Sequence, residues 1–161
     1  MNLTLNLHQG ELSIVRLSPQ AVLPAWLDLA ARPLVSVTFA ANELSIVCPT
    51  NLVPPGHRSE GPWRAFEIEG PIDFALTGVL ASVLHPLAAA GLSIFALSTY
   101  DTDWALVRSE KLATAQAALR RISSFARPRS AETGSSAHHP SSETPTYPAP
   151  VVQTRDPAAL P

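Results

Sequence analysis

The sequence predicts an α+β protein in which antiparallel sheets carry helices on one face. The first 126 of its 161 residues are about half apolar, whereas only nine of the last 35 are hydrophobic, so the buried core is expected before residue 126. Within that part, apolar residues change between strand and helix spacing in the order strand, helix, strand, strand, and this order occurs twice. Such units favour the split βαβ arrangement, and we expect two of them side by side.

The first half spans residues 11–61 and contains four expected elements. Three of them are expected strands: residues 11–17, which alternate between apolar and polar residues as a half-buried strand does, and residues 34–40 and 43–48. Residues 22–30 are a short helical candidate with Pro24 near the start. Only Ala41 and Asn42 separate the second and third strands, which predicts a hairpin. A loop rich in proline and glycine then joins the two halves.

The second half spans residues 62–126. Its expected strands are residues 64–69, 93–99 and 103–108, of which the last two form a second hairpin. Helices are expected from about residue 72 to residue 90 and from residue 109 to about residue 125. The first helix has apolar residues at helical spacing, namely Leu76, Val79, Leu80, Val83 and Leu87. Gly91 is placed to end it.

The remaining residues, 127–161, have a composition that predicts a disordered tail. Prolines, serines and threonines dominate this segment, and it has too few apolar residues to repay the entropy of an ordered backbone. Residues 144–150 (TPTYPAP) also suit a polyproline ligand or a phosphorylation site.

Composition and missing motifs exclude several classes of function. A formal net charge of −2 argues against a nucleic-acid binder, and no apolar run is long enough to cross a membrane. The N-terminus lacks the features of a secretion signal, and the single Cys48 permits no internal disulfide, so the cytoplasm is the expected location. No phosphate-binding glycine loop and no metal-ligand spacing of histidines occurs, and neither a cofactor nor a metal is expected. Cys48 ends an apolar strand and is expected to be a buried structural thiol, and His85 is expected on the solvent face of its helix.

Polar residues gather in two loops of the second half. Residues 70–73 (GPID) lead into the expected helix, whose free N–H groups and dipole would attract an anion. Asp73 fits two roles there equally well, a helix cap or a ligand contact. Residues 97–103 (LSTYDTD) bring a carboxylate, hydroxyls and an aromatic ring to one strand end, which is ordinary turn chemistry but also suits a cationic amine. The two loops together suit a free amino acid and offer no obvious nucleophile and base.

Residues 63–108 strongly resemble the ACT-domain family that includes the cytosolic arginine sensors called CASTOR. The stretches that carry the resemblance are EGPIDF (69–74), HPLA (85–88), GLSI (91–94) and LSTYDTD (97–103), with ELSIVC (43–48) and VPPG (53–56) upstream. The similarity extends from about residue 12 to residue 125. It implies a pair of ferredoxin-like ACT folds with a small ligand held between domains.

The resemblance also implies ligand contacts. By their match to the family, these are Ser93, Ile94, Thr99, Tyr100 and Asp103, and Asp73 is added because it lies in the turn that corresponds to the ligand-facing loop. Asp103 is expected on the charged groups of the ligand, while Ser93 and Ile94 match strand positions that contact it. Asp73 and Leu76 stand where the arginine sensors have a glycine and a glutamate. Since this chain has one ACT pair where those sensors have two, a homodimer would rebuild the whole pocket, with each strand 93–99 near its two-fold mate or near the facing turn 70–73.

Two functions of different class follow. The first is a non-catalytic cytoplasmic protein that binds an amino acid, such as arginine, as a sensor and changes its association with a protein partner. The second is a dimerising or protein-interaction scaffold that binds no ligand. An enzyme ranks third, because no catalytic triad, dyad or metal set appears in the sequence. Asp73 and Asp103 could act as a carboxylate pair, but each has a cap or turn explanation.

Overall fold

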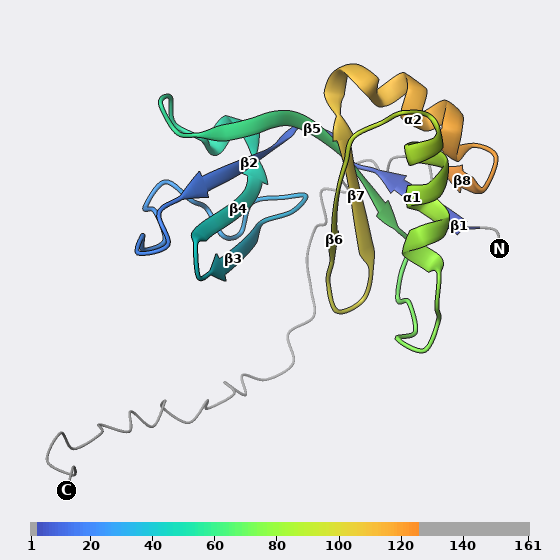
Figure 1. Ribbon diagram of the computed structural model, residues 1–161, viewed down its shortest axis with the longest axis horizontal. Helices are drawn as coiled ribbons and strands as arrows, with labels where there is room; N and C mark the ends of the chain where they lie inside the picture. Colours follow the sequence, from blue (N-terminus) through green and yellow to red (C-terminus); the bar gives the residue numbers. More distant parts are fainter. Residues whose placement is uncertain (1–2, 126–161) are drawn as a thin grey trace, which may run out of the picture. The chain divides into compact units, whose positions relative to one another are not determined.

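The computed structural model describes residues 3–125, and every statement below concerns this part of the chain (Figure 1). The predictions of a disordered tail and of a ligand or modification site within residues 144–150 lie outside the described residues.

Eight strands and two α-helices make up the described part. The strands are β1 (Leu3–Leu7), β2 (Leu12–Leu17), β3 (Ser36–Ala40), β4 (Glu43–Pro49), β5 (Ser59–Ile68), β6 (Ile94–Ser98), β7 (Asp103–Arg108) and β8 (Ser123–Phe125). The helices are α1 (Val79–Ala89) and α2 (Leu112–Leu119). One short 3-10 turn follows β4, and another precedes α2. The two predicted hairpins are β3–β4 and β6–β7.

The ten-residue strand β5 joins the two halves into a single sheet. On one edge of β5, the first residues pair with β2 and the last residues pair with β1, both antiparallel. On the opposite edge of β5, residues 63–67 pair with β7. The strand order is β3-β4-β2-β5-β1-β8, with β7 and then β6 on the other side of β5. The expectation of two separate sheets is therefore wrong.

Both helices pack on one face of the β5–β7 part of the sheet (Figure 1). The core between them contains Phe66 from β5, Val83 and Leu87 from α1, and Leu119 from α2, all fully buried. This arrangement confirms the α+β class and the helices on one face for the second half.

The N-terminal strand β1 was not expected from the sequence, and neither was β8. β1 lies between β5 and β8, and its Leu5 is fully buried in the same core as the helices. It pairs with β8 in parallel, so the sheet is not wholly antiparallel. The second half is thus completed by residues from the very start of the chain.

The predicted helix over residues 22–30 is wrong, because this segment forms isolated turns. Leu27 N–H donates to the Pro24 carbonyl at 3.0 Å, and Asp28 accepts at its side chain from the Ala30 N–H at 2.9 Å. Proline has no N–H and blocks the preceding turn, and an aspartate that binds its own neighbours competes with helix formation. The first half therefore does not repeat the strand and helix order of the second.

Both predicted helices of the second half are too long. Gly78 lies just before α1 with a φ of 81°, a left-handed conformation that an α-helix cannot contain, so the helix begins at Val79 rather than near residue 72. The second helix ends at Leu119, and the chain continues into β8. The predicted end of the first helix is confirmed, because Gly91 follows it with a φ of 72°. No helix in residues 3–125 is long and apolar enough to cross a membrane.

Candidate functional site

A surface pocket of about 260 Å³ lies where the segment after β5 meets the turn between β6 and β7. Both polar loops singled out in the sequence contribute to it. Its lining residues are Ile72, Asp73, Phe74, Leu76, Ser98, Thr99, Tyr100, Asp101, Thr102 and Asp103.

Backbone contacts hold the two loops together. The Ile72 N–H donates to the Asp101 carbonyl at 2.8 Å, and the Thr102 hydroxyl donates to the carbonyl of Ile68 at the end of β5. Gly70 lies so close that a Cβ there would stand 2.6 Å from the Asp101 carbonyl oxygen. The absence of a side chain at Gly70 therefore lets the two loops meet.

The β6–β7 turn is held by its own hydroxyl groups. The backbone N–H and the hydroxyl of Thr99 both donate to the Thr102 carbonyl, at 2.8 Å and 3.0 Å. Ser98 donates to one carboxylate oxygen of Asp103 at 2.5 Å. The other oxygen of Asp103 has no hydrogen-bond partner among the described residues, so it can accept from a ligand.

Asp73 does not lie at a helix N-terminus, because α1 begins six residues later at Val79. Its carboxylate accepts from the Ala75 N–H at 2.9 Å, and its carbonyl accepts from the Leu76 N–H at 2.9 Å. Asp73 therefore stabilises a turn. The expected anion site at residues 70–73 is wrong for the same reason, since no helix dipole points at this loop.

Two aromatic rings stand exposed beside the pocket. Phe74 and Tyr100 are 74% and 80% exposed, and their rings meet edge to face with centroids 5.3 Å apart. Leu76, also in the lining, is 54% exposed. Such a group of large exposed side chains at one place commonly marks a binding surface.

The pocket is acidic. Asp73, Asp101 and Asp103 line it, no lysine or arginine does, and none of the three forms an ion pair within residues 3–125. Aromatic faces and carboxylates together attract cations. The arrangement therefore suits a ligand with an ammonium or guanidinium group.

The structure brings four of the six predicted site residues together and leaves two apart. Asp73, Thr99, Tyr100 and Asp103 line the pocket. Ser93 and Ile94 do not, since Ile94 pairs with Val107 at the other end of the β6–β7 hairpin and packs against the helix core. A ligand contact of Ser93 and Ile94 stays a prediction.

Sequence reasoning did not single out Phe74 and Asp101 as site residues. Both lie next to residues that were singled out, so the position of the two polar loops in the sequence was the signal that could have found them. Their shared pocket depends on the contact between two loops that are far apart in sequence, made by the Ile72 N–H and the Asp101 carbonyl. Periodicity within one segment cannot reveal such a contact.

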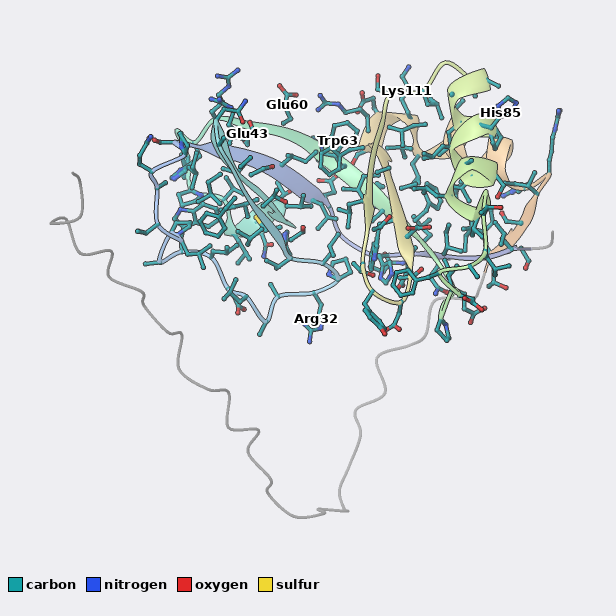
Figure 2. The ribbon with its side chains drawn as sticks, turned by 60° about the horizontal axis from the view of Figure 1, so that its bottom comes forward. Arg32, Glu43, Glu60, Trp63, His85 and Lys111 are labelled. Carbon is teal, nitrogen blue, oxygen red and sulfur yellow. The ribbon has the colours of Figure 1, made fainter. Side chains whose placement is uncertain are left out.

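The remaining candidates lie outside the pocket. Burial raises the pKa of the Cys48 thiol to about 11, because desolvation disfavours the thiolate, and the residue is fully buried. His85 lies exposed on α1, as expected (Figure 2). Within residues 3–125 no group of histidine, cysteine, aspartate and glutamate side chains could hold a metal ion.

Two family models match different parts of the chain. A family model described as an ACT domain matches residues 58–121. A second family model, described as an N-terminal domain, matches residues 10–56. A search of curated proteins found no match.

Several solved structures are similar. Protein Atu0741 from Agrobacterium tumefaciens is 36% identical with a TM-score of 0.72, and the alignment covers 78% of this chain and 93% of that protein. Protein VC0802 from Vibrio cholerae is 19% identical with a TM-score of 0.62, and the coverage is 75% and 90%. The aspartokinase alpha and beta subunits are 13% identical with a TM-score of 0.54, and the coverage is 76% and 98%. The last two likenesses concern the fold alone.

Proposed function

Since this chain belongs to the ACT-domain family, whose members are regulatory modules that commonly bind amino acids, we propose that it is a non-catalytic regulatory protein that binds a free amino acid. The ligand lies in the pocket between the segment after β5 and the β6–β7 turn. The observation that carries the proposal is the acidic and aromatic lining, in which one carboxylate oxygen of Asp103 has no partner among residues 3–125.

The lining favours a cationic amino acid such as arginine. Its ammonium or guanidinium group binds Asp103 and lies against the Tyr100 ring, an arrangement that carboxylates and aromatic faces stabilise. This is the ligand type of the CASTOR sensors, which the chain resembles in residues 97–103. Asp73 and Leu76, which stand in place of a glycine and a glutamate there, adapt the pocket to a ligand of different shape.

The pocket has no evident partner for the carboxylate of an amino acid. No cationic side chain from the described part of the chain lines it, and the N-terminus of α1, which could bind a carboxylate, lies elsewhere. A second copy of the chain, placed over the exposed Phe74 and Tyr100, supplies the binding partner for the ligand's carboxylate and covers both rings. The proposed active form is therefore a cytoplasmic homodimer that changes its association with a protein partner when the ligand binds.

The second candidate is a scaffold that binds no amino acid. The exposed Phe74, Leu76 and Tyr100 favour it, because they form an apolar surface that a protein partner could cover without a ligand. In that case the acidic residues select a basic partner instead of a small molecule.

A thermal-shift screen of the full-length protein against the twenty amino acids separates the two candidates. A ligand that binds only the folded state raises the melting temperature with its concentration. We expect one amino acid or a small cationic set to do so. If none shifts the melting temperature at millimolar concentration, the sensor proposal is wrong and the scaffold is favoured.

A further inference from the structure

The outer edge of β3 is an open strand edge. β3 stands at one end of the strand order and pairs with β4 alone (Figure 1). Among the described residues, no hydrogen bond reaches residues 36–40 from outside this ladder. Proteins usually protect such an edge with a charge, a proline or a bulge. The sequence of β3, SVTFA, contains neither charge nor proline, and its pairing with β4 runs without a bulge.

The backbone groups that point to this edge belong to Val37 and Phe39. The hairpin loop between β3 and β4 has two residues, so Ala40 and Glu43 close it as a hydrogen-bonded pair. Such pairs alternate along an antiparallel ladder, which makes Thr38 and Ser45 the next one. Val37 and Phe39 therefore turn their N–H and C=O groups away from β4.

The same edge carries an exposed aromatic ring. Phe39 is 64% exposed, although its neighbour across the ladder, Leu44, is fully buried. Val37 shares its strand face and packs against the core of the first half. An uncovered ring beside an unpaired strand edge indicates a surface that another strand covers.

We propose that β3 pairs antiparallel with β3 of a second copy of this chain, about a two-fold axis through Thr38. In this register Val37 lies opposite Phe39 of the second copy, and the backbone groups that face the open edge bond to one another. The side chains then form an aromatic and β-branched cross-strand pair, which is a favourable combination. The neighbouring symmetric registers would pair Val37 or Phe39 with residues 41 or 35, which lie outside β3.

This contact is separate from the pocket and does not depend on the proposed ligand. β3 belongs to the first half, whereas the pocket is built from the segment after β5 and the β6–β7 turn. A chain that binds no amino acid would still pair through β3. A chain whose β3 is blocked would still pair over the pocket and bind its ligand there.

A cysteine at Thr38 tests the register directly in the full-length protein. Directly opposite residues of a non-hydrogen-bonded pair have Cα atoms about 4.5 Å apart, within the range that a disulfide spans. Under mild oxidation Thr38→Cys is expected to form a covalent dimer. The matched control is Ala40→Cys on the same strand, whose two copies would lie about 13 Å apart in this register and stay unlinked. The native Cys48 is buried and does not compete.

The variant Phe39→Pro tests the pairing without a cross-link. Proline at this position removes an N–H that faces the open edge and leaves the bonds to β4 in place. Light scattering at micromolar concentration is expected to show half the mass of the parent, with an unchanged melting temperature. Tyr100→Ser, on the pocket side, is expected to leave the β3 cross-link of Thr38→Cys intact.

The proposal is overturned if Phe39→Pro keeps the parent mass, or if the parent has the mass of one chain at 100-fold higher concentration. It is equally overturned if Thr38→Cys stays unlinked, or if Ala40→Cys cross-links as readily as Thr38→Cys. The cysteine pair decides the matter should Phe39→Pro fail to fold.

Discussion

Asp103 is the residue on which the proposed ligand contact depends most directly. Its side chain is oriented by Ser98, and its second carboxylate oxygen is open to a ligand cation. Asp103→Ala is expected to weaken amino-acid binding by about 1.5–3 kcal/mol, the range for a lost hydrogen bond to a charged group. Calorimetric titration measures the loss. Glu110→Ala, which removes an exposed acid after the far end of β7, is the control and should bind as the parent does.

If Asp103→Ala binds the ligand as tightly as the parent, Asp103 is not a ligand contact and the site lies elsewhere. Equal losses in Asp103→Ala and Glu110→Ala would instead show that net charge, and not a defined contact, attracts the ligand.

Cys48 makes the stability of the fold sensitive to alkali. Burial raises the pKa of its thiol to about 11, whereas in the unfolded chain the thiol titrates near its ordinary value of 9.0. Above that value the unfolded state loses the proton first, so ionisation favours unfolding. The contribution of Cys48 to the free energy of unfolding is expected to be intact below about pH 8.5 and to fall as the pH rises toward 11.

Urea unfolding of the parent and of Cys48→Ala at pH 8 and pH 10.5 measures this effect. The difference in free energy of unfolding between the two proteins should be smaller at the higher pH, because only the parent has a buried thiol whose ionisation favours unfolding. A difference that is the same at both values would contradict it.

At the scale of elements, the site depends on how closely the segment after β5 approaches the β6–β7 turn. A Cβ at Gly70 would stand 2.6 Å from the Asp101 carbonyl oxygen, so Gly70→Ala must push the two loops apart. We expect a loss of about 1–3 kcal/mol in stability, as for other overpacked sites, together with weaker amino-acid binding. Thermal unfolding and calorimetric titration measure the two effects.

Gly56→Ala is the control for this change. Gly56 has a φ of 88° in the loop between the halves, and nothing lies within 4 Å of a Cβ added there. A side chain in this conformation costs about 1–2 kcal/mol but leaves the pocket alone. If both variants keep the parent affinity, the spacing of the two loops does not determine binding.

At the scale of the whole molecule, the part that matches the ACT domain is not complete without the start of the chain. β1 covers one edge of β5, carries β8 on its other side, and buries Leu5 in the helix core. Burial of one leucine contributes about 1.5–3 kcal/mol, a large share of the 5–15 kcal/mol that stabilises a typical domain. A chain of residues 58–125 alone is therefore expected to be unfolded by circular dichroism and amide dispersion.

The matched control is a chain of residues 1–129, which keeps every described strand and helix. It is expected to melt within experimental error of the full-length protein, since the residues after 129 have the composition of a segment that does not pack. A folded 58–125 chain would show that β1 is dispensable. A loss of several degrees in the 1–129 chain would show that residues after 129 contribute to the fold. The division of the chain at residues 61 and 62 stays a proposal, and β5 runs across it.

Local patterns of residues predicted the hairpins and the end of the first helix. Residues 103–108 are a strand with the predicted bounds, and the 43–48 strand is extended by one residue. Their signal is a short apolar run bounded by polar turn residues, which depends only on residues next to one another in the chain. Gly91 ends α1 because a left-handed residue needs no tertiary contact to stop a helix.

The wrong predictions are those in which local and tertiary preferences compete. Residues 22–30 have apolar residues at helical spacing, yet Pro24 and Asp28 bind locally and the segment stays a series of turns. Residues 3–7 alternate as a strand does, but only the pairing with β5 and β8 shows that they form one. Pairing partners far apart in sequence leave no trace in periodicity.

The sequence by itself determined the class of fold, the two loops that hold the candidate site, and the acidic and aromatic character of those loops, because composition and short-range spacing carry this information. Only the tertiary structure decided that Asp73 lies in a turn rather than at a helix, that Asp101 and Phe74 join the site, and that β1 completes the second half. The physical reason is that a pocket and a sheet edge are made by segments that meet in space. Which segments meet depends on how the whole chain buries its apolar surface.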